Sequence, residues 1–199
     1  RAMNLGLAES YRVMLRAMDQ LLFGNAQNVF MPASDGHETH VDRSINVISS
    51  GAQHDRYFAE VDDVVVSIFS RESLSEQPRY VADMGCGDGT FLKRVFETVR
   101  DRTPRGKNLR EYPLTLIGID LNQASLVETG LTLAGIDHIL APGDIGNPQQ
   151  MIEDLRGRGV DPARVLHIRS FLDHDRPYIP PADQAALEVA LNEGAIIGE

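Results

Sequence analysis

Short runs of strand-forming residues alternate along the chain with stripes of apolar residues at helical spacing. The strand-like runs occupy residues 79–83, 114–120, 136–141 and 164–169. A continuous apolar run is typical of a strand that is buried on both faces, and strands that alternate with helices indicate parallel pairing through crossover helices. The pattern therefore predicts an α/β fold, in which one parallel sheet carries helices on both faces.

The same pattern divides the chain into an N-terminal helical and lid segment, residues 1–78, and a core, residues 79–199. Within the core, helical spacing of apolar residues predicts four helices. They span residues 90–100, 124–134, 151–158 and 182–191. Residues 101–113 are charged and contain prolines and a glycine, so we expect a surface loop there.

The N-terminal segment contains two further predicted helices. Residues 3–23 have apolar side chains at helical spacing, and residues 55–69 repeat the pattern with Asp55 as a candidate N-cap. Residues 25–54 lack a clear period, and a long irregular segment in a compact domain is usually functional or disordered. For the first helix we favour a packing role, with a lid over a substrate as the alternative.

A glycine-rich turn follows the first strand. The acid Asp83 stands two residues before the first of three alternating glycines, Gly85, Gly87 and Gly89. Glycine permits positive φ and leaves no Cβ in the way of a ligand, and the helix that follows offers unpaired N–H groups. Dinucleotide folds use the different spacing G-x-G-x-x-G. The turn predicts a ligand-binding loop, and an ordinary glycine-rich turn of another α/β protein is the alternative.

Composition narrows the classes of partner. The net charge of −10 and the lack of a basic run disfavour binding to nucleic acid. No apolar stretch approaches the length of a membrane span. The one cysteine, Cys86, can form no intramolecular disulfide, so we expect a reducing, cytoplasmic location. Because the chain starts at Arg1 and stops at Glu199 without an initiator methionine or a polar tail, we expect a fragment of a larger polypeptide.

A second acid marks the end of the next strand. Asp120 closes the run 114–120, and an acid at this place can hydrogen-bond the two hydroxyls of a ribose. Its distance from the glycines exceeds the ~20 residues usual in dinucleotide folds. The predicted loop at 101–113 accounts for the excess.

Asp83 and the three glycines resemble motif I of the class I S-adenosylmethionine-dependent methyltransferases. In that family the loop lies under a nucleoside and an amino acid, the sheet is Rossmann-like, and the acid helps to hold the cationic methionyl end. The resemblance implies that Asp144, after the third strand, meets the adenine amino group and that Ile145 contacts the ring. A simple aspartate turn is the alternative for Asp144. Leu121, beside Asp120, and Arg169, at the end of the fourth strand, complete the expected cofactor-binding set. The sheet of this family has more strands than the chain can supply, so we expect it to be truncated at the C-terminus.

Two other stretches resemble a narrower group, the metal-dependent C-methyltransferase domains of polyketide synthase loading modules. They are the histidine-bearing segment 37–54 and the run Ser170-Phe-Leu-Asp-His-Asp-Arg176. The resemblance implies methylation of the α-carbon of a malonyl-type group on an acyl carrier protein, with an iron or manganese ion and with neighbouring synthase domains as partners. A divalent metal would stabilise the enolate that this reaction needs.

The residues that we expect to perform this chemistry lie in the same two stretches. His174 and Asp173 are the candidate catalytic residues, and His54, Gln53 and His174 are the candidate metal ligands, because imidazole and carboxamide or carboxylate groups suit iron or manganese. We expect His54 to open a helix and His174 to follow the fourth strand, so that both face the methyl group. For each histidine, an ordinary surface or core position is an equal alternative.

Two other functions stay open. One is a metal-free small-molecule O-methyltransferase in which His174 is a general base. The other is a structural domain that binds the cofactor without catalysis.

Overall fold

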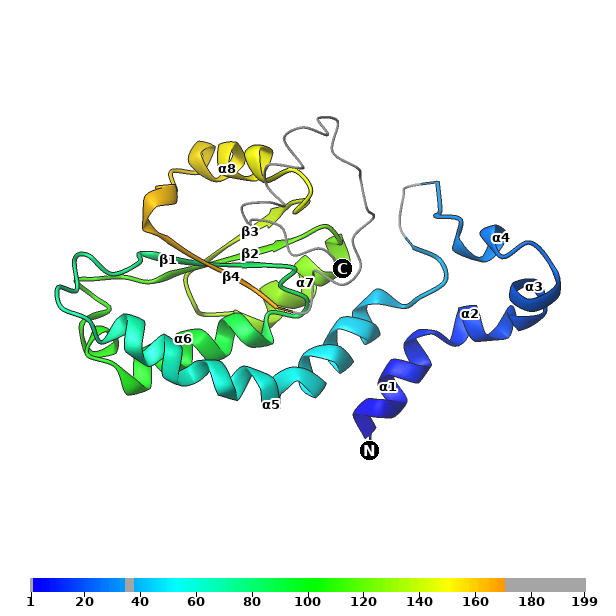
Figure 1. Cartoon of the computed structure of the whole chain (residues 1–199), viewed down its shortest axis with the longest axis horizontal. Coiled ribbons are helices and arrows are strands. Elements are labelled where there is room, and N and C mark those ends of the chain that lie inside the picture. Colours follow the sequence, from blue (N-terminus) through cyan, green and yellow to red (C-terminus); the bar gives the residue numbers. More distant parts are fainter. Residues whose placement is uncertain (1, 35–37, 171–199) are drawn as a thin grey trace, which may run out of the picture.

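The computed structural model describes residues 2–34 and 38–170. In this part of the chain, four parallel strands form one sheet in the order β3-β2-β1-β4 (Figure 1). The strands are β1 (Tyr80–Met84), β2 (Thr115–Asp120), β3 (His138–Pro142) and β4 (Val165–Arg169). The strand order confirms the predicted parallel pairing and places β1 between β2 and β4. Between β1 and β4 the order reverses, and ligands of open α/β sheets bind at such a point, beyond the carboxyl ends of the strands.

Helices cover both faces of the sheet, as predicted. On one face lie α6 (Thr90–Arg102) and α7 (Gln123–Thr132), with α5 (Arg43–Phe69) packed along them, and on the other lies α8 (Pro148–Gly157) (Figure 1). Successive strand residues point to opposite faces. Val81 therefore joins the core under α6, whereas Ala82 joins the core under α8. The architecture is a Rossmann-like α/β fold.

The helix α5 is much longer than predicted. It spans 27 residues and begins at Arg43, where the Asp42 side chain caps it by accepting a hydrogen bond from the Ile45 N–H at 3.1 Å. The predicted N-cap Asp55 lies inside this helix, so that prediction is wrong, as is the irregular course expected for residues 43–54. His54 consequently lies within a helix and does not open one.

The predicted helix 3–23 is three short helices. They are α1 (Ala2–Ser10), α2 (Arg12–Arg16) and α3 (Met18–Phe23), and α4 (Gln27–Phe30) follows them. Of these four N-terminal helices, only α1 packs closely on α5: a Cβ built at Gly6 would lie 2.2 Å from Ser49 Oγ.

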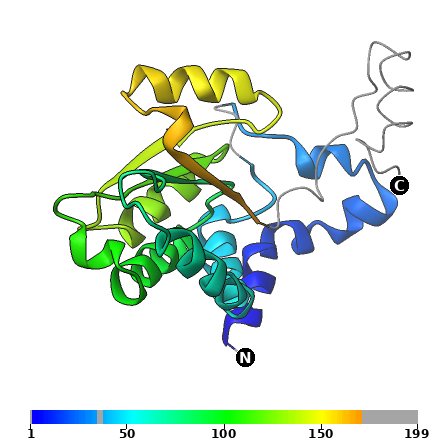
Figure 2. The same ribbon diagram turned by 60° about the vertical axis from the view of Figure 1, so that its left-hand side comes forward.

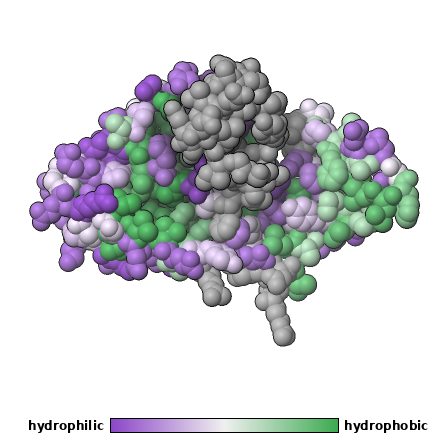
Figure 3. All heavy atoms as spheres, in the orientation of Figure 1, coloured by the Kyte–Doolittle hydropathy of each residue, from purple (hydrophilic) through white to green (hydrophobic). Residues whose placement is uncertain are grey.

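The helices α2, α3 and α4 form an arm that stands off the core (Figures 1 and 2). Apolar side chains gather on this arm, on the right of Figure 3, and Phe23 is 90% exposed. The other exposed apolar residues of the arm include Val13, Leu15, Leu22, Phe30 and Met31. Residues 3–23 are therefore largely helical, as the apolar spacing predicted. The apolar stripe of the arm does not face a core within the described residues.

The segment 101–113 is also more ordered than a surface loop. It contains the 3-10 helix η1 (Arg105–Asn108), and the Arg105 side chain is only 2% exposed. Its guanidinium donates hydrogen bonds to five oxygens, and burial lowers the pKa of the group. The acceptors are the carbonyls of Leu74, Pro78, Tyr112 and Pro113 and Oε1 of Gln77. Arg105 thus joins the segments that lead into β1 and β2.

The remaining predictions differ from the structure mainly at the ends of elements. Helix α6 runs to Arg102, α8 begins at Pro148, and β3 begins at His138. The predicted helix 182–191 lies outside the described residues. Among the described helices, none has the length and apolar character needed to cross a membrane.

Candidate functional site

The glycine loop is held against the carboxyl end of β2 by its backbone. The Gly85 and Cys86 N–H groups donate to the Ile119 carbonyl at 2.8 and 3.1 Å, and the Gly87 N–H donates to Oδ2 of Asp120 at 3.1 Å. The three glycines have φ values of +78°, +58° and +78°, in the left-handed region that favours glycine. The residue type at these positions is therefore fixed by backbone conformation as well as by space.

Two of the glycines face very different surroundings. A Cβ built at Gly89 would lie 2.9 Å from Cγ2 of Thr129, so Gly89 permits α7 to pack against the loop. A Cβ built at Gly87 would meet no atom of the described residues within 4 Å. Gly87 therefore borders open space at the end of β1, which is where a ligand of this fold would lie.

Asp83 is a buried carboxylate in need of a partner. It is 2% exposed, and its Oδ1 atom accepts no hydrogen bond from the described residues. Burial, with a smaller contribution from the nearby Asp120 charge, raises the pKa of Asp83 to about 8. A buried charge is costly unless it is paired. A cationic ligand would supply that pairing, so the site fits the positively charged methionyl end of S-adenosylmethionine.

Asp120 remains available to a ligand although the protein contacts both of its oxygens. Oδ1 accepts from the Asn122 N–H at 2.9 Å, and Oδ2 accepts from the Gly87 N–H. The Ser125 side chain also hydrogen-bonds this carboxylate. Because a carboxylate has about four lone-pair sites, one is still left for a ribose hydroxyl. Burial raises the pKa of Asp120, and the backbone hydrogen bonds and Arg43 oppose that rise.

The other expected cofactor residues lie along the same edge of the sheet. Leu121 follows Asp120 and is 77% exposed. The Gly143 N–H donates to the Asp120 carbonyl at 3.1 Å, which brings Asp144 and Ile145 beside the end of β2. Oδ1 of Asp144 accepts from the Gly146 N–H at 2.7 Å, as in the alternative aspartate turn, and its other oxygen is left for a ligand.

Arg169 is the last residue of β4 and pairs with Met84, the residue directly before the glycine loop. The structure thus brings Asp83, Asp120, Asp144 and Arg169 to one edge of the sheet.

Part of the expected metal site lies close to this edge. The helix α5 crosses the glycine loop so tightly that a Cβ built at Gly51 would lie 2.5 Å from Oδ1 of Asp88. Gln53 and His54 follow within the next turn of α5. The ring of His54 lies 6.0 Å from that of Phe58, which stacks on Phe91 of α6 at 4.5 Å. Burial lowers the pKa of His54 and so favours the neutral imidazole, the form that binds metal.

The structure does not describe the other residues of the expected catalytic and metal site. Asp173 and His174 fall outside the described residues. Within residues 2–34 and 38–170, no group of three or more histidine, cysteine or acidic side chains is arranged to hold a metal ion. The described part of the chain therefore supplies only Gln53 and His54 of the expected ligand set.

Sequence reasoning missed two residues of this edge, Glu38 and Arg43. Oε2 of Glu38 accepts hydrogen bonds from Nε of Arg43 at 2.7 Å and from Nδ2 of Asn122 at 3.3 Å. For Arg43 a signal exists only once the start of α5 is known. A basic residue in the first turn of a helix opposes the helix dipole, so Arg43 needs another reason to be there.

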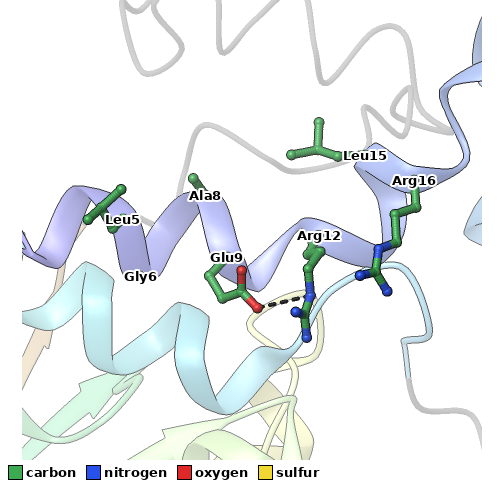
Figure 4. A pocket seen from close by; sticks show the side chains of 7 residues that line it. All are labelled: Leu5, Gly6, Ala8, Glu9, Arg12, Leu15 and Arg16. Carbon is green, nitrogen blue, oxygen red and sulfur yellow. Dashed lines mark ion pairs between the residues drawn. The ribbon is translucent and has the colours of Figure 1, made fainter.

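A surface hollow of about 640 Å³ lies along α1 and α2 (Figure 4). Two of its lining residues, Glu9 and Arg12, form an ion pair of 2.9 Å, with both side chains about half exposed. None of the lining residues belongs to the glycine loop or to the strand ends. The hollow is lined by Leu5, Gly6, Ala8, Glu9, Arg12, Leu15 and Arg16. We therefore assign it no part in the site.

Comparison with known proteins gives a matching family model and several similar solved structures, among them two plantazolicin methyltransferases. The family model described as "AprA MT2-like domain" matches residues 38–199. The plantazolicin methyltransferase BamL, solved with a triazolic desmethylPZN analog and SAH, matches at 15% identity over 74% of this chain and 44% of its own, with a TM-score of 0.33. The plantazolicin methyltransferase BpumL, solved with SAH, matches at 15% identity over 74% of this chain and 45% of its own, with a TM-score of 0.32. This chain spans less than half the length of either protein. No curated protein sequence matches it.

Proposed function

The chain belongs to the family of AprA MT2-like domains and is an S-adenosylmethionine-dependent methyltransferase, and from that premise we propose its acceptor and mechanism. The proposed acceptor is the α-carbon of a malonyl-type group carried on an acyl carrier protein. The proposed metal is one iron or manganese ion. We place the domain in the cytoplasm among the other domains of a polyketide synthase.

The observation that carries the cofactor assignment is the open space beside Gly87 together with the buried Asp83, whose Oδ1 accepts no hydrogen bond from the described residues. S-adenosylmethionine supplies a methyl group on a cationic sulfur. Asp83 would balance the charge of its methionyl end, Asp120 would accept hydrogen bonds from the ribose, and Asp144 with Ile145 would contact the adenine. These residues come from three strand ends that meet at one edge of the sheet.

The position of α5 supports the proposed metal chemistry. Gly51 lets this helix approach Asp88 of the glycine loop closely. Gln53 and His54, two and three residues further along α5, would then lie on the side of the cofactor. Together with His174 they would hold the ion. When bound, the ion would offset the negative charge that develops on a malonyl-type acceptor as its α-proton leaves. The lowered pKa of His54 means that this imidazole stays neutral, and able to bind, to a lower pH than an ordinary histidine.

The alternative functions use the same cofactor site. In the metal-free O-methyltransferase, a neutral imidazole, that of His174, removes the proton from a small hydroxylated acceptor. In the structural domain, the cofactor binds but no acceptor is methylated. The experiment below separates the three.

The test is methyl transfer from S-adenosylmethionine to a malonyl-loaded carrier protein, followed by mass spectrometry, together with elemental analysis of the purified protein. We expect His54→Ala and His174→Ala to lose both the metal and the transfer while they still bind S-adenosylmethionine. His138→Gln is the matched control, because the His138 imidazole is bonded to the Ile136 carbonyl at the start of β3. That variant should keep its metal and its activity.

Two results would replace the proposal. Full transfer to the carrier substrate after chelation of the metal would rule out the metal mechanism and favour a general base. Cofactor binding without transfer to any carrier-bound or small acceptor would favour the structural domain.

A further inference from the structure

A line of polar side chains runs from helix α1 to the ribose-binding end of β2. Nδ2 of Asn46 donates to Oγ of Ser10 at 3.2 Å, and Oδ1 of Asn46 accepts from Nη1 of Arg43 at 3.3 Å. Arg43 in turn donates to Oε2 of Glu38 through both Nε and Nη2. The line therefore connects α1 and α5 to the short segment that precedes α5.

The line ends on the residue next to the ribose-binding acid. Oε2 of Glu38 also accepts from Nδ2 of Asn122, a residue 84 positions away in the chain. Asn122 is fixed from two further sides: its Oδ1 caps α7 by accepting from the Ala124 N–H, and its own N–H donates to Oδ1 of Asp120. A movement of Glu38 would therefore be transmitted to Asp120 through one side chain.

The Glu38–Arg43 pair is more than a solvated surface ion pair. The two side chains are 34% and 30% exposed, and three N–H donors converge on one oxygen of Glu38. Charge-assisted hydrogen bonds with two parallel donors fix geometry as well as adding energy. The Arg43 charge also lowers the pKa of Asp120 against the effect of burial and so favours its ionised, accepting form. The nearby acid Asp83 also interacts with Asp120: the Asp120 charge helps to raise the pKa of Asp83.

We propose that Glu38 and Arg43 are positioning residues of the nucleoside site: they hold Asn122, and through it Asp120, in the place from which Asp120 contacts the ribose hydroxyls. The inference rests on the assignment of S-adenosylmethionine as the cofactor and is independent of the proposed acceptor and metal. It makes the segment before α5 a part of the cofactor site, although that segment carries no part of the glycine motif.

The test measures the affinity for S-adenosylhomocysteine and for its 2′-deoxyribose analogue by isothermal titration. Glu38→Gln keeps the shape of the side chain and removes its charge, and Asn122→Asp keeps the cap of α7 but removes the donor to Glu38. Each should weaken S-adenosylhomocysteine binding roughly tenfold, which corresponds to ~1.4 kcal/mol. The analogue lacks one of the ribose hydroxyls, so each variant should weaken its binding by a smaller factor. The affinity for S-adenosylhomocysteine divided by that for the analogue should therefore be smaller in the variants than in the wild type.

Exchange of the donor and the acceptor provides the rescue. In the double variant Glu38→Gln/Asn122→Asp, the amide of residue 38 can donate to the carboxylate of residue 122, so the hydrogen bond is restored with reversed polarity. We expect its affinity for S-adenosylhomocysteine to lie closer to that of the wild type than either single variant does. A residue that merely stabilises the fold would show no such recovery.

The matched control is Asp62→Asn, which weakens an ion pair between α5 and α6, where Asp62 accepts from Nε and Nη2 of Arg94 at 2.9 Å each. It should lower the thermal unfolding temperature and leave the ratio of the two affinities unchanged.

Several results would overturn the inference. Wild-type affinity in folded Glu38→Gln and Asn122→Asp would do so, as would an equal loss for both ligands. If the wild-type protein bound no S-adenosylhomocysteine, the inference and the cofactor assignment would fall together. Cofactor binding without methyl transfer to the carrier substrate would instead overturn only the proposed function.

Discussion

Replacing Gly87 with alanine should separate ligand binding from folding. The residue has φ +58°, and an alanine in this region costs about 1–2 kcal/mol. Within residues 2–34 and 38–170 the added Cβ meets no atom within 4 Å, so we expect no steric penalty in the ligand-free state. We therefore expect the free energy of unfolding to fall by only about 1–2 kcal/mol, while the methyl group projects into the space that the nucleoside needs.

Gly89→Ala is the matched comparison on the same loop. Its φ of +78° imposes a similar backbone cost, but its Cβ would lie 2.9 Å from Cγ2 and 3.1 Å from Cα of Thr129. The second of these atoms is backbone and cannot rotate away. Overpacking of this kind costs typically ~1–3 kcal/mol in addition, so Gly89→Ala should be the less stable of the two variants.

The assay pairs urea unfolding with isothermal titration of S-adenosylhomocysteine. Gly87→Ala should stay folded and lose at least about tenfold in affinity, or ~1.4 kcal/mol. If folded Gly87→Ala binds the ligand as tightly as the wild type does, the open space above Gly87 is not the nucleoside site. If it unfolds as readily as Gly89→Ala, the steric comparison between the two positions is wrong.

Three further variants test other parts of the structure. Asp83 has a pKa of about 8 in the folded protein and of ~3.9 in the unfolded chain. Between these two pH values the folded protein keeps the proton and the unfolded chain has released it. The free energy of unfolding of the ligand-free protein should therefore fall with rising pH, by up to ~1.4 kcal/mol per pH unit. Urea unfolding across that range should show a steeper slope in the wild type than in Asp83→Asn, which keeps the smaller contribution of Asp120; equal slopes would contradict the assignment. Gly51→Ala should push α5 away from Asp88 and weaken cofactor binding as well as stability, and unchanged binding by titration would show that the contact is unimportant. Arg105→Met should leave several buried oxygens unpaired and lower the free energy of unfolding by more than ~3 kcal/mol, and a loss below ~1 kcal/mol in urea unfolding would refute that reasoning.

The strands were predictable because each is a short run rich in strand-forming apolar residues, and β1 and β2 are almost wholly buried. Their ends then located Asp83 and Asp120, since residues at the carboxyl ends of parallel strands share one edge of a sheet. The first half of α5 was not predictable in the same way. Its buried face includes Asn46, Ser49 and Gly51, where α1 and the glycine loop approach too closely for large apolar side chains, so the usual hydrophobic period is absent.

The N-terminal helices show a different limit. Apolar periodicity reports the helical phase of residues 3–23, but it does not report the breaks at Tyr11 and Ala17. Glu38 could not be found from local pattern at all, because its contact with Asn122 joins distant parts of the chain. Arg105 looked exposed for the same reason: the carbonyls that bury it come from turns on both sides of β1.

The way in which Arg105 is satisfied has a consequence for how the domain responds to its solution. Its partners are neutral oxygens of the backbone and of one amide, so neither protonation of an acid nor added salt removes them. The amino-terminal edge of the sheet is thus held by hydrogen bonds from Arg105 to neutral groups. The opposite edge depends on Asp83 and Asp120, whose raised pKa values make their charges sensitive to pH, and on the Glu38–Arg43 pair, whose attraction salt weakens. A change in acidity or ionic strength should therefore alter ligand affinity well before it loosens the attachment of β1 to β2 at their starting ends.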